Sequence, residues 1–359
     1  MTSGDEERPL RVVCAGDRFI RAAAFAEEVR RVLGDDVEVV EHQSEWPDVP
    51  FGPVDDVKEA AGDADELGEL LAGADVLLTH LAPVTAAVLD RATKLRVVGV
   101  TRGGPVNVDL PAASRVGVPV VFLPGRNLSA VAEFAVGVMI ALPRGIAAAS
   151  RSLAGGTWDS QWFRHDRTGP ELSACTVGLV GAGAVGLRVA ELLAGFGSRV
   201  LAHDPYADPA ELERRGIVAV TFEELLAGSD VVSLHARLTD DTRHLMDADA
   251  FAQMRPGAYL VNTARGELVD QAALLAALES GHLGGVATDV FHPEPPDPDD
   301  PLLARDDVLA TPHLAGSSRQ VAELSVRRVV AEVAGFLRQG TLEHCANPEW
   351  DGPDEEGER

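Results

Sequence analysis

Three short motifs place an arginine, a glutamate and a histidine directly after apolar segments that are typical of strands. They read Asn262-Thr-Ala-Arg265-Gly, Asp289-Val-Phe-His-Pro-Glu294-Pro and Thr311-Pro-His313-Leu-Ala-Gly316. Open α/β sheets bind ligands beyond the carboxyl ends of their strands, so the three side chains can converge on one site. A histidine titrates near neutral pH and can give or take a proton, and the fork of an arginine suits a carboxylate.

A glycine-rich turn earlier in the chain indicates a dinucleotide site. Gly181-Ala-Gly183-Ala184-Val185-Gly186 follows an apolar run at 176–180 and opens a helical segment, and a second apolar run then ends at Asp204. Strand, glycine turn, helix, strand and acid form the dinucleotide fingerprint. The first glycine permits a tight turn, the second lets the backbone approach a pyrophosphate, and the third lets the helix pack closely on the strand. The pyrophosphate then meets the free N–H groups of the helix.

The acid at the end of the fingerprint favours NAD over NADP. A carboxylate at Asp204 accepts hydrogen bonds from both adenosine ribose hydroxyls and repels a 2′-phosphate. The residues that follow it, Pro-Tyr-Ala-Asp-Pro, include no arginine that would hold such a phosphate.

Strands alternating with helices predict two parallel sheets, each covered on both faces, and therefore an α/β fold class. In the first part, strands are expected at 10–15, 37–40, 75–81, 95–101 and 118–123, and helices at 18–33, 86–92 and 110–116. The segment 41–65 is expected to be a loop, either without helix or with one helical turn. In the second part, further strands are expected at 231–236, 259–263, 285–290 and 308–310, and helices at 221–227, 248–254 and 270–279. A final helix at 317–338 could return to the first domain.

These elements predict a domain made of residues 1–124 and 317–345, a dinucleotide-binding domain at 125–316, and a disordered acidic tail at 346–359. Hinges are expected near 124–127 and 316–318, where the chain crosses between the domains. The stretch 129–153 is helical and strongly apolar, with Pro143 expected to kink or divide it. We expect it to form a homodimer interface, with core packing as a close alternative.

Composition narrows the classes of partner. The net charge of −26 over 359 residues makes nucleic acid and anionic membranes unlikely general partners. Cys14, Cys175 and Cys345 show no metal-ligand spacing, so no metal site is expected. The N-terminus is charged, and the longest apolar run, 134–143, is too short to cross a bilayer. The chain reads as a reduced cytoplasmic protein.

The ordered motifs, from about residue 74 to 340, resemble the D-isomer-specific 2-hydroxyacid dehydrogenases, a family that includes phosphoglycerate dehydrogenase and the glyoxylate/hydroxypyruvate reductases. The resemblance implies a flavodoxin-like substrate domain and a Rossmann NAD-binding domain with the active-site cleft between them, in a short form without a regulatory domain. It also implies NAD as cofactor and a small 2-oxo or 2-hydroxy acid as substrate.

The resemblance further assigns roles. His313 corresponds to the acid/base, Glu294 to the carboxylate that holds the other imidazole nitrogen, Arg265 to the group that binds the substrate carboxylate, and Asp289 to the acid that binds the nicotinamide carboxamide. His235 is expected to line the adenine side of the cofactor site. The alternative is a purely structural role. The expected cofactor contacts are Gly181, Gly183, Ala184, Val185, Gly186, Asp204, His235, Thr263, Ala264, Arg265, Asp289, His313 and Gly316.

The expected substrate loop departs from the family pattern. The family usually has Gly-x-Gly-x-Asp-Asn, and the matching stretch here is Thr101-Arg102-Gly103-Gly104-Pro105-Val106-Asn107. Gly103 and Gly104 can still supply a backbone cradle for a carboxylate. We hypothesise that Arg102, which replaces a glycine, binds a second anionic group of the substrate; an arginine pointing to solvent is the alternative. Thr79 stands where phosphoglycerate dehydrogenases commonly carry an arginine, which disfavours phosphoglycerate.

A binding module is the competing interpretation, because some members of this family are NADH-sensing transcriptional corepressors. Such a protein would need an exposed peptide groove in its first domain, and the acidic segment 41–65 gives no sign of one. Turnover on a small 2-oxo acid would favour the enzyme.

Overall fold

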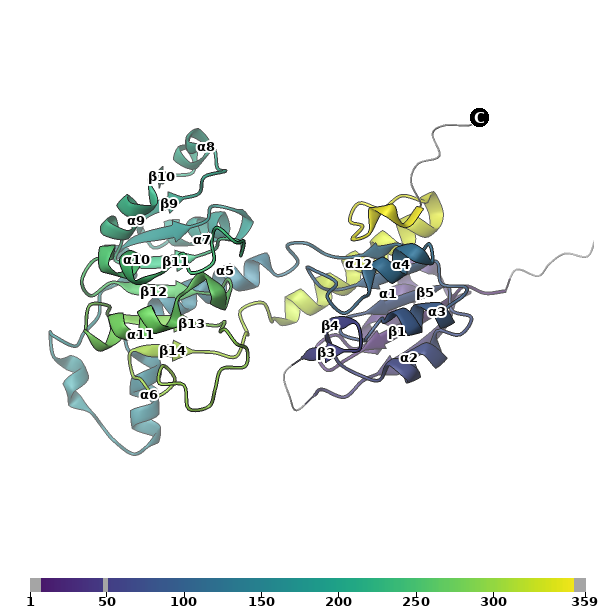
Figure 1. The fold of residues 1–359 in the computed structure, drawn as a ribbon, viewed down its shortest axis with the longest axis horizontal. Helices are drawn as coiled ribbons and strands as arrows, with labels where there is room; N and C mark the ends of the chain where they lie inside the picture. Colours follow the sequence, from purple (N-terminus) through teal and green to yellow (C-terminus); the bar gives the residue numbers. More distant parts are fainter. Residues whose placement is uncertain (1–7, 48–50, 352–359) are drawn as a thin grey trace, which may run out of the picture. The chain divides into compact units, whose positions relative to one another are not determined.

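The computed structural model describes residues 8–47 and 51–351, and the chain forms two compact units (Figure 1). Unit 1 joins the chain up to Arg126 with the chain from Ser318 onward, and unit 2 spans Asn127–Ser317. The boundaries expected from the sequence fell after residues 124 and 316.

Unit 1 is built on a five-stranded sheet in the order β2-β1-β5-β6-β7, with every neighbouring pair parallel. The strands are Arg11–Gly16 (β1), Glu38–Gln43 (β2), Val76–Thr79 (β5), Val97–Val100 (β6) and Val120–Val121 (β7). Numbered along the chain within this sheet, the order is 2-1-3-4-5, which is the flavodoxin-like order. The flavodoxin-like expectation is therefore confirmed.

Helices cover both faces of this sheet. Successive side chains of a strand point to opposite faces and are apolar on both, so each face needs a layer of helices to bury it. Val12 and Cys14 pack with α1 (Ala22–Leu33) and α12 (Arg319–Gln339). Val13 faces the opposite layer, which contains α2 (Ala64–Leu70), α3 (Ala86–Arg91) and α4 (Leu110–Arg115). The final helix thus belongs to the first domain, as predicted.

Three parts of unit 1 differ from the sequence-based expectation, and the first is α2, a helix at Ala64–Leu70 that was not expected. The segment expected as a loop contains an antiparallel hairpin, β3 (Gly52–Val54) and β4 (Val57–Ala60), whose turn holds Asp55 at a φ of +49°. The tail expected to be disordered from residue 346 continues as ordered structure to 351, because Asn347 is buried and its Oδ1 accepts a hydrogen bond from Val120 N at 2.8 Å. A short 3-10 turn follows at Pro348–Asp351, and residues 352–359 lie outside the described part.

Unit 2 is built on a seven-stranded parallel sheet in the order β10-β9-β8-β11-β12-β13-β14. The strands are Thr176–Val180 (β8), Arg199–His203 (β9), Ile217–Ala219 (β10), Val231–Leu234 (β11), Tyr259–Asn262 (β12), Gly285–Thr288 (β13) and Val308–Ala310 (β14). This is the Rossmann order 3-2-1-4-5-6 with a seventh strand, and its switch point lies between β8 and β11. The Rossmann expectation is confirmed, although the sequence reading missed β10 and the short helix α8 (Pro209–Arg214).

Two layers of helices cover the unit 2 sheet. One layer holds α5 (Leu128–Ala141) and α7 (Ala184–Ala194), and the other holds α9 (Phe222–Gly228), α10 (Ala248–Gln253) and α11 (Gln271–Glu279). The long apolar stretch is divided as predicted around Pro143, since α5 and α6 (Ile146–Ala154) meet at 68°. No single described helix is long and apolar enough to span a membrane, although this bent pair passes the same test taken together.

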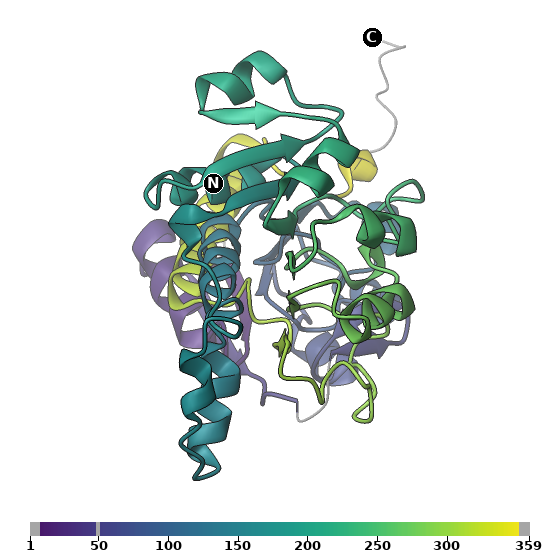
Figure 2. The same ribbon diagram turned by 90° about the vertical axis from the view of Figure 1, so that its left-hand side faces the viewer.

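A connector at 155–173 follows α6 and lies along the outside of unit 2 (Figure 2). It contains two short 3-10 turns, Ser160–Phe163 and Leu172–Ala174. A Cβ added at Gly145 would lie 2.5 Å from the Trp162 ring, so the absence of a side chain there lets Trp162 pack against the bend before α6.

Candidate active site

The glycine turn after β8 has the geometry that the sequence predicted for each of its glycines. Gly181 has a φ of +98°, and an added Cβ would lie 2.8 Å from Ala236 N, so the turn requires glycine. A Cβ at Gly186 would lie 2.2 Å from Gly181 O, which explains the close packing of α7 on the strand. A Cβ at Gly183 would meet nothing within 4 Å. The open side of the turn is therefore at Gly183, where the fingerprint expects the pyrophosphate.

The amino-terminal end of α7 is suited to an anion. Gly183 caps the helix without any side-chain hydrogen bond, and the first turn contains no acidic residue. The first amides of a helix lack internal acceptors, and the helix dipole adds partial positive charge there. The residues present thus fit the pyrophosphate of a dinucleotide.

Asp204 follows β9 and faces the same turn. Its Oδ2 accepts a hydrogen bond from Ala182 N at 2.8 Å, and its Oδ1 accepts one from Tyr206 N at 2.9 Å. An ionised carboxylate has about four acceptor positions, so Asp204 fixes the turn and keeps capacity for hydroxyl donors.

His235 lies at the end of β11, directly against the glycine turn. Its backbone carbonyl would lie 2.9 Å from a Cβ at Gly181, and its ring Nε2 is 3.0 Å from Ser233 Oγ. Burial lowers the pKa of His235 to about 4, so the ring is neutral at neutral pH. The contact with Ser233 supports the structural interpretation, and the position beside the turn is compatible with the adenine-side interpretation.

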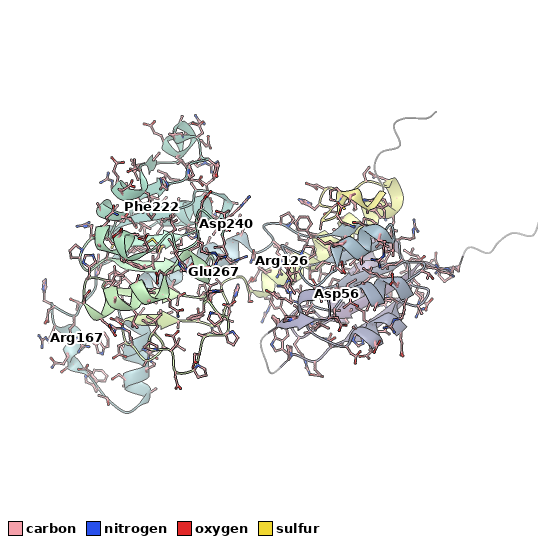
Figure 3. All side chains as sticks on the ribbon, in the orientation of Figure 1. Asp56, Arg126, Arg167, Phe222, Asp240 and Glu267 are labelled. Atoms are coloured by element: carbon pink, nitrogen blue, oxygen red, sulfur yellow. The ribbon has the colours of Figure 1, made fainter. Side chains whose placement is uncertain are left out.

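The three chemistry-bearing motifs come together within unit 2. A Cβ at Gly266 would lie 2.2 Å from the carbonyl of Phe291, so the loop after Arg265 lies directly against the segment that leads to Glu294. Glu267, labelled in Figure 3, has its Oε1 3.5 Å from Nδ1 of His292 in the same segment. The convergence expected from the strand ends is therefore present.

Asp289 holds the loop that carries the histidine. This buried carboxylate accepts hydrogen bonds from Thr311 Oγ1 at 2.6 Å, from Leu314 N at 2.7 Å and from Ala315 N at 2.7 Å. The sequence reading gave Asp289 only a cofactor role and missed this positioning role. His313 has a φ of +54°, an uncommon backbone conformation for a residue other than glycine, and the Asp289 hydrogen bonds hold it there.

His313 and Glu294 form a hydrogen-bonded pair. Nδ1 of His313 is 2.9 Å from Oε2 of Glu294, and both side chains are partly exposed. The hydrogen bond to Glu294 raises the pKa of His313; burial and the positive charge of Arg265 oppose the rise. With Nδ1 engaged, Nε2 is the nitrogen left to exchange a proton.

The loop after β12 positions Arg265. Asn262 Oδ1 accepts from Ala264 N at 3.0 Å and Asn262 Nδ2 donates to Arg265 O at 2.8 Å, which ties the loop into a fixed turn. Arg265 itself is exposed and donates from Nη1 to Ala264 O at 2.6 Å. Thr263 Oγ1 is a buried hydroxyl with no partner among the described residues, which fits a polar ligand at this loop.

Gly316 ends the loop that carries His313. A Cβ at Gly316 would lie 2.5 Å from Nδ2 of Asn127, so the absence of a side chain at Gly316 leaves room for the Asn127 side chain before α5.

The expected substrate loop lies in unit 1, after β6. Gly103 and Gly104 are exposed, and an added Cβ at Gly104 would meet nothing within 4 Å. The side chain of Arg102 is 19 % exposed and donates from Nη2 to Glu59 Oε2 at 2.5 Å. Its side chain is therefore held against Glu59 within unit 1, and its contact with a substrate stays a prediction.

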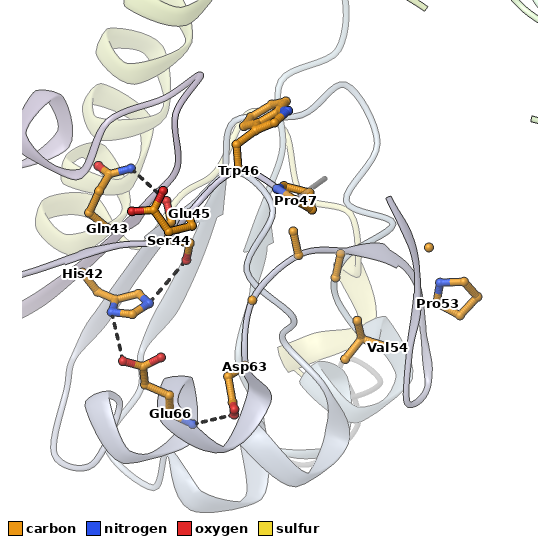
Figure 4. A pocket seen from close by; sticks show the side chains of 14 residues that line it. His42, Gln43, Ser44, Glu45, Trp46, Pro47, Pro53, Val54, Asp63 and Glu66 are labelled. Atoms are coloured by element: carbon orange, nitrogen blue, oxygen red, sulfur yellow. Dashed lines mark hydrogen bonds and ion pairs between the residues drawn. The ribbon is translucent and has the colours of Figure 1, made fainter. Parts of the chain in front are cut away.

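A pocket of about 640 Å³ lies elsewhere in unit 1, between the end of β2 and the hairpin (Figure 4). Its lining includes His42, Trp46 and Glu66, with His42 Nδ1 3.6 Å from Glu66 Oε1. None of its lining residues belongs to the three motifs or the glycine turn.

Comparison with known proteins agrees with this geometry. Residues 136–315 match the family model described as the D-isomer specific 2-hydroxyacid dehydrogenase, NAD binding domain. The glyoxylate reductase of Thermofilum pendens is 37 % identical over 286 residues, which cover 76 % of this chain and 82 % of that protein. The chain belongs to the D-isomer-specific 2-hydroxyacid dehydrogenase family.

Other relatives differ in length or carry other names. The D-3-phosphoglycerate dehydrogenase of Archaeoglobus fulgidus is 38 % identical over 257 residues, which cover 72 % of this chain and 48 % of that protein, so the chain spans about half of that relative. The structure of the D-lactate dehydrogenase from Escherichia coli has a TM-score of 0.74 and 27 % identity, covering 94 % of this chain and all of that one. These names are names of enzymes, and they do not favour the corepressor-like module.

Proposed function

We propose that this chain is an NAD-dependent D-2-hydroxyacid dehydrogenase that interconverts a small 2-oxo acid and its D-2-hydroxy acid. The observation that carries the proposal is the 2.9 Å hydrogen bond between His313 Nδ1 and Glu294 Oε2, on a loop next to the one that carries Arg265. A histidine held in this way is an oriented acid/base, and a neighbouring arginine supplies the charge that a substrate carboxylate needs.

In reduction, Nε2 of His313 donates a proton to the carbonyl oxygen of the substrate. Glu294 accepts the hydrogen bond from Nδ1, which fixes the ring and stabilises the imidazolium before the transfer. Arg265 binds the substrate carboxylate with its planar fork and orients the carbonyl group. Bound NADH supplies the hydride that reduces the carbonyl carbon. In oxidation, neutral His313 takes the proton from the hydroxyl group.

We assign cofactor contacts on the same basis. The amides at the start of α7 bind the pyrophosphate, and Asp204 binds the ribose hydroxyls with the acceptor capacity that its two backbone contacts leave. Asp289 accepts three hydrogen bonds from the loop that carries His313 and keeps room for one more donor, the nicotinamide carboxamide. Thr263, with its unpaired buried hydroxyl, lies on the loop where the cofactor would complete its hydrogen bonding.

Loss of NADH absorbance against a panel of 2-oxo acids tests the proposal. The panel contains glyoxylate, hydroxypyruvate, phenylpyruvate, 2-oxoglutarate and 3-phosphohydroxypyruvate, because the relatives carry the names of enzymes with different substrates. We expect turnover with NADH well above that with NADPH. No turnover on the whole panel, together with a tight peptide partner, would contradict the proposal.

We also propose that the protein is a homodimer that uses the arm formed by α6 and the connector. α5 buries one face in the core of unit 2, which supports the core-packing alternative for this helix. The arm exposes Ile146, Leu153, Trp158 and Phe163, with Trp158 79 % and Phe163 82 % exposed. Large apolar side chains clustered on one surface segment are typical of protein interfaces.

A further inference from the structure

Four charged or titratable side chains gather at the carboxyl edge of the unit 1 sheet. Asp17 follows β1, His80 follows β5, Arg102 follows β6, and Arg126 follows β7. The Arg102 carbonyl accepts a hydrogen bond from Leu123 N at 2.8 Å, and Arg126 N donates to Leu123 O at 3.3 Å, so the loops that carry the two arginines are joined through Leu123. The sequence analysis assigned no role to His80, which lay within a predicted strand, or to Arg126, which lay in the loop after one.

Asp17 and His80 form a hydrogen bond with one another. Asp17 Oδ2 is 2.7 Å from His80 Nδ1, and Asp17 Oδ1 accepts from the amides of Phe19 and Ile20, each at 2.8 Å. Burial lowers the pKa of His80 and outweighs the hydrogen bond and charge of Asp17, which raise it; the nearby Arg126 and Arg102 add to the lowering, which favours the neutral ring. Asp17 is thus occupied by other donors and makes no ion pair with Arg126.

Arg102 and Arg126, in contrast, have buried hydrogen-bond donors without acceptors in the part of the chain that the structure describes. Nε and Nη1 of Arg126 and Nη1 of Arg102 are shielded from solvent and have no acceptor among the described residues. Glu59 takes only Nη2 of Arg102. Burial and the charge of Arg102 lower the pKa of Arg126 to about 10, so the guanidinium group of Arg126 remains charged at neutral pH. Two positive charges that lie close together and have unused hydrogen-bond donors destabilise the folded protein, unless an anion binds to both.

We propose that Arg102 and Arg126 bind one oxyanionic group, a carboxylate or a phosphate, of a dianionic 2-oxo acid substrate. An oxyanion accepts several hydrogen bonds in a plane that matches the guanidinium fork, so one group can satisfy donors from both arginines. The proposal rests on the dehydrogenase activity proposed above and narrows it to a substrate class. It also assigns an orienting function to Glu59, which holds one edge of Arg102 and leaves Nη1 free.

Kinetics with matched substrates tests the site. For wild type, Arg102→Gln and Arg126→Gln, we would measure kcat/KM for 2-oxoglutarate and 3-phosphohydroxypyruvate relative to hydroxypyruvate, which has one anionic group. Each variant should lower the dianion-to-monoanion ratio by roughly tenfold or more, because a hydrogen bond to a charged group is lost. The dianion with the larger loss identifies carboxylate or phosphate. Arg115→Gln, an exposed arginine paired with Asp90, is the control and should keep the wild-type ratio.

Calorimetry with inorganic phosphate and with succinate as probes separates this proposal from the activity on which it rests. The wild-type protein should bind at least one probe, and Arg126→Gln should weaken that binding by roughly tenfold. Turnover with an unchanged ratio in both variants would overturn the arginine site and leave the dehydrogenase in place. Probe binding that depends on Arg126, without turnover on any 2-oxo acid, would support the site and overturn the proposed activity. Absence of Arg126-dependent binding of either probe would overturn the site.

Discussion

At the residue scale, Glu294 determines when His313 is protonated. The hydrogen bond between them raises the pKa of His313, so the imidazolium persists to higher pH than an isolated histidine would allow. Reduction needs the protonated ring, and its rate should therefore fall as pH rises through this raised pKa. In Glu294→Gln the stabilising charge is lost, and the falling limb of the pH profile should move to lower pH.

The matching measurement is kcat/KM for reduction as a function of pH in wild type and in Glu294→Gln. Oxidation, which needs the neutral ring, should show its rising limb displaced in the same direction. An unchanged midpoint in both directions would show that Glu294 does not act through His313.

Loss of His313 itself should remove proton transfer without removing cofactor binding. His313→Ala is expected to lower kcat by roughly 10²–10⁴-fold, the usual contribution of a positioned acid/base. The side chain is about half exposed and its loop is held by Asp289, so the fold should tolerate the change. NADH affinity measured by fluorescence should stay near the wild-type value, and a large loss there would point to a structural role instead.

The sequence predicted the identity of these side chains better than their contacts. Arg265, Glu294 and His313 could be named because their motifs follow strands that share one edge of a parallel sheet, and because the family resemblance assigned their roles. The three donors that occupy Asp289 could not be foreseen, because they come from a loop whose path depends on tertiary packing. Arg126 escaped notice because its environment, not its type, makes it unusual.

At the element scale, the glycine turn offers a test that separates cofactor binding from folding. Gly183→Ala adds a methyl group into open space at a φ of −71°, so the protein should fold with nearly unchanged stability. The same methyl group lies where the backbone must approach the pyrophosphate, so NADH affinity should fall by roughly tenfold or more. Gly335→Ala, in α12 with equally open surroundings, is the control and should leave NADH affinity unchanged.

Stability and affinity should be measured on the same preparations, by thermal unfolding with and without NADH. Wild type should unfold at a higher temperature with NADH, since a ligand at about 100 times its Kd stabilises the native state by about 2.7 kcal/mol. If Gly183→Ala keeps the full shift, the pyrophosphate does not lie at this turn.

The elements that the sequence failed to predict are short. The alternation of strands and helices was sufficient to predict two parallel sheets, and the family resemblance implied the flavodoxin-like and Rossmann folds. The β3–β4 hairpin lies in an acidic, proline-containing segment without regular apolar alternation, so its pattern was typical of a loop. Residues 346–351 are ordered by the amide of Asn347, which donates to Val118 O and accepts from Val120 N. A contact between residues so far apart in the chain cannot be predicted from the local sequence around residue 347.

At the scale of the whole molecule, self-association would explain why the arm of unit 2 carries large apolar side chains on its surface. Trp162 packs against Gly145, and Arg167 lies 4.7 Å from the centre of the Trp162 ring, so the connector is folded back on the bend before α6. Trp158 and Phe163 nevertheless remain on the surface. Covering two large aromatic side chains contributes several kcal/mol to association, on the order of 2 kcal/mol each.

Replacing Trp158 and Phe163 by serine should therefore shift the equilibrium from the homodimer toward the monomer. Sedimentation velocity over a range of concentrations would measure the shift, with far-UV circular dichroism to show that the fold is kept. Tyr206→Ser is the control, because Tyr206 is 95 % exposed yet lies outside the arm, and it should leave the assembly unchanged. A wild-type protein that sediments as one chain, or a double variant that keeps the wild-type assembly, would show that this arm does not hold two copies together.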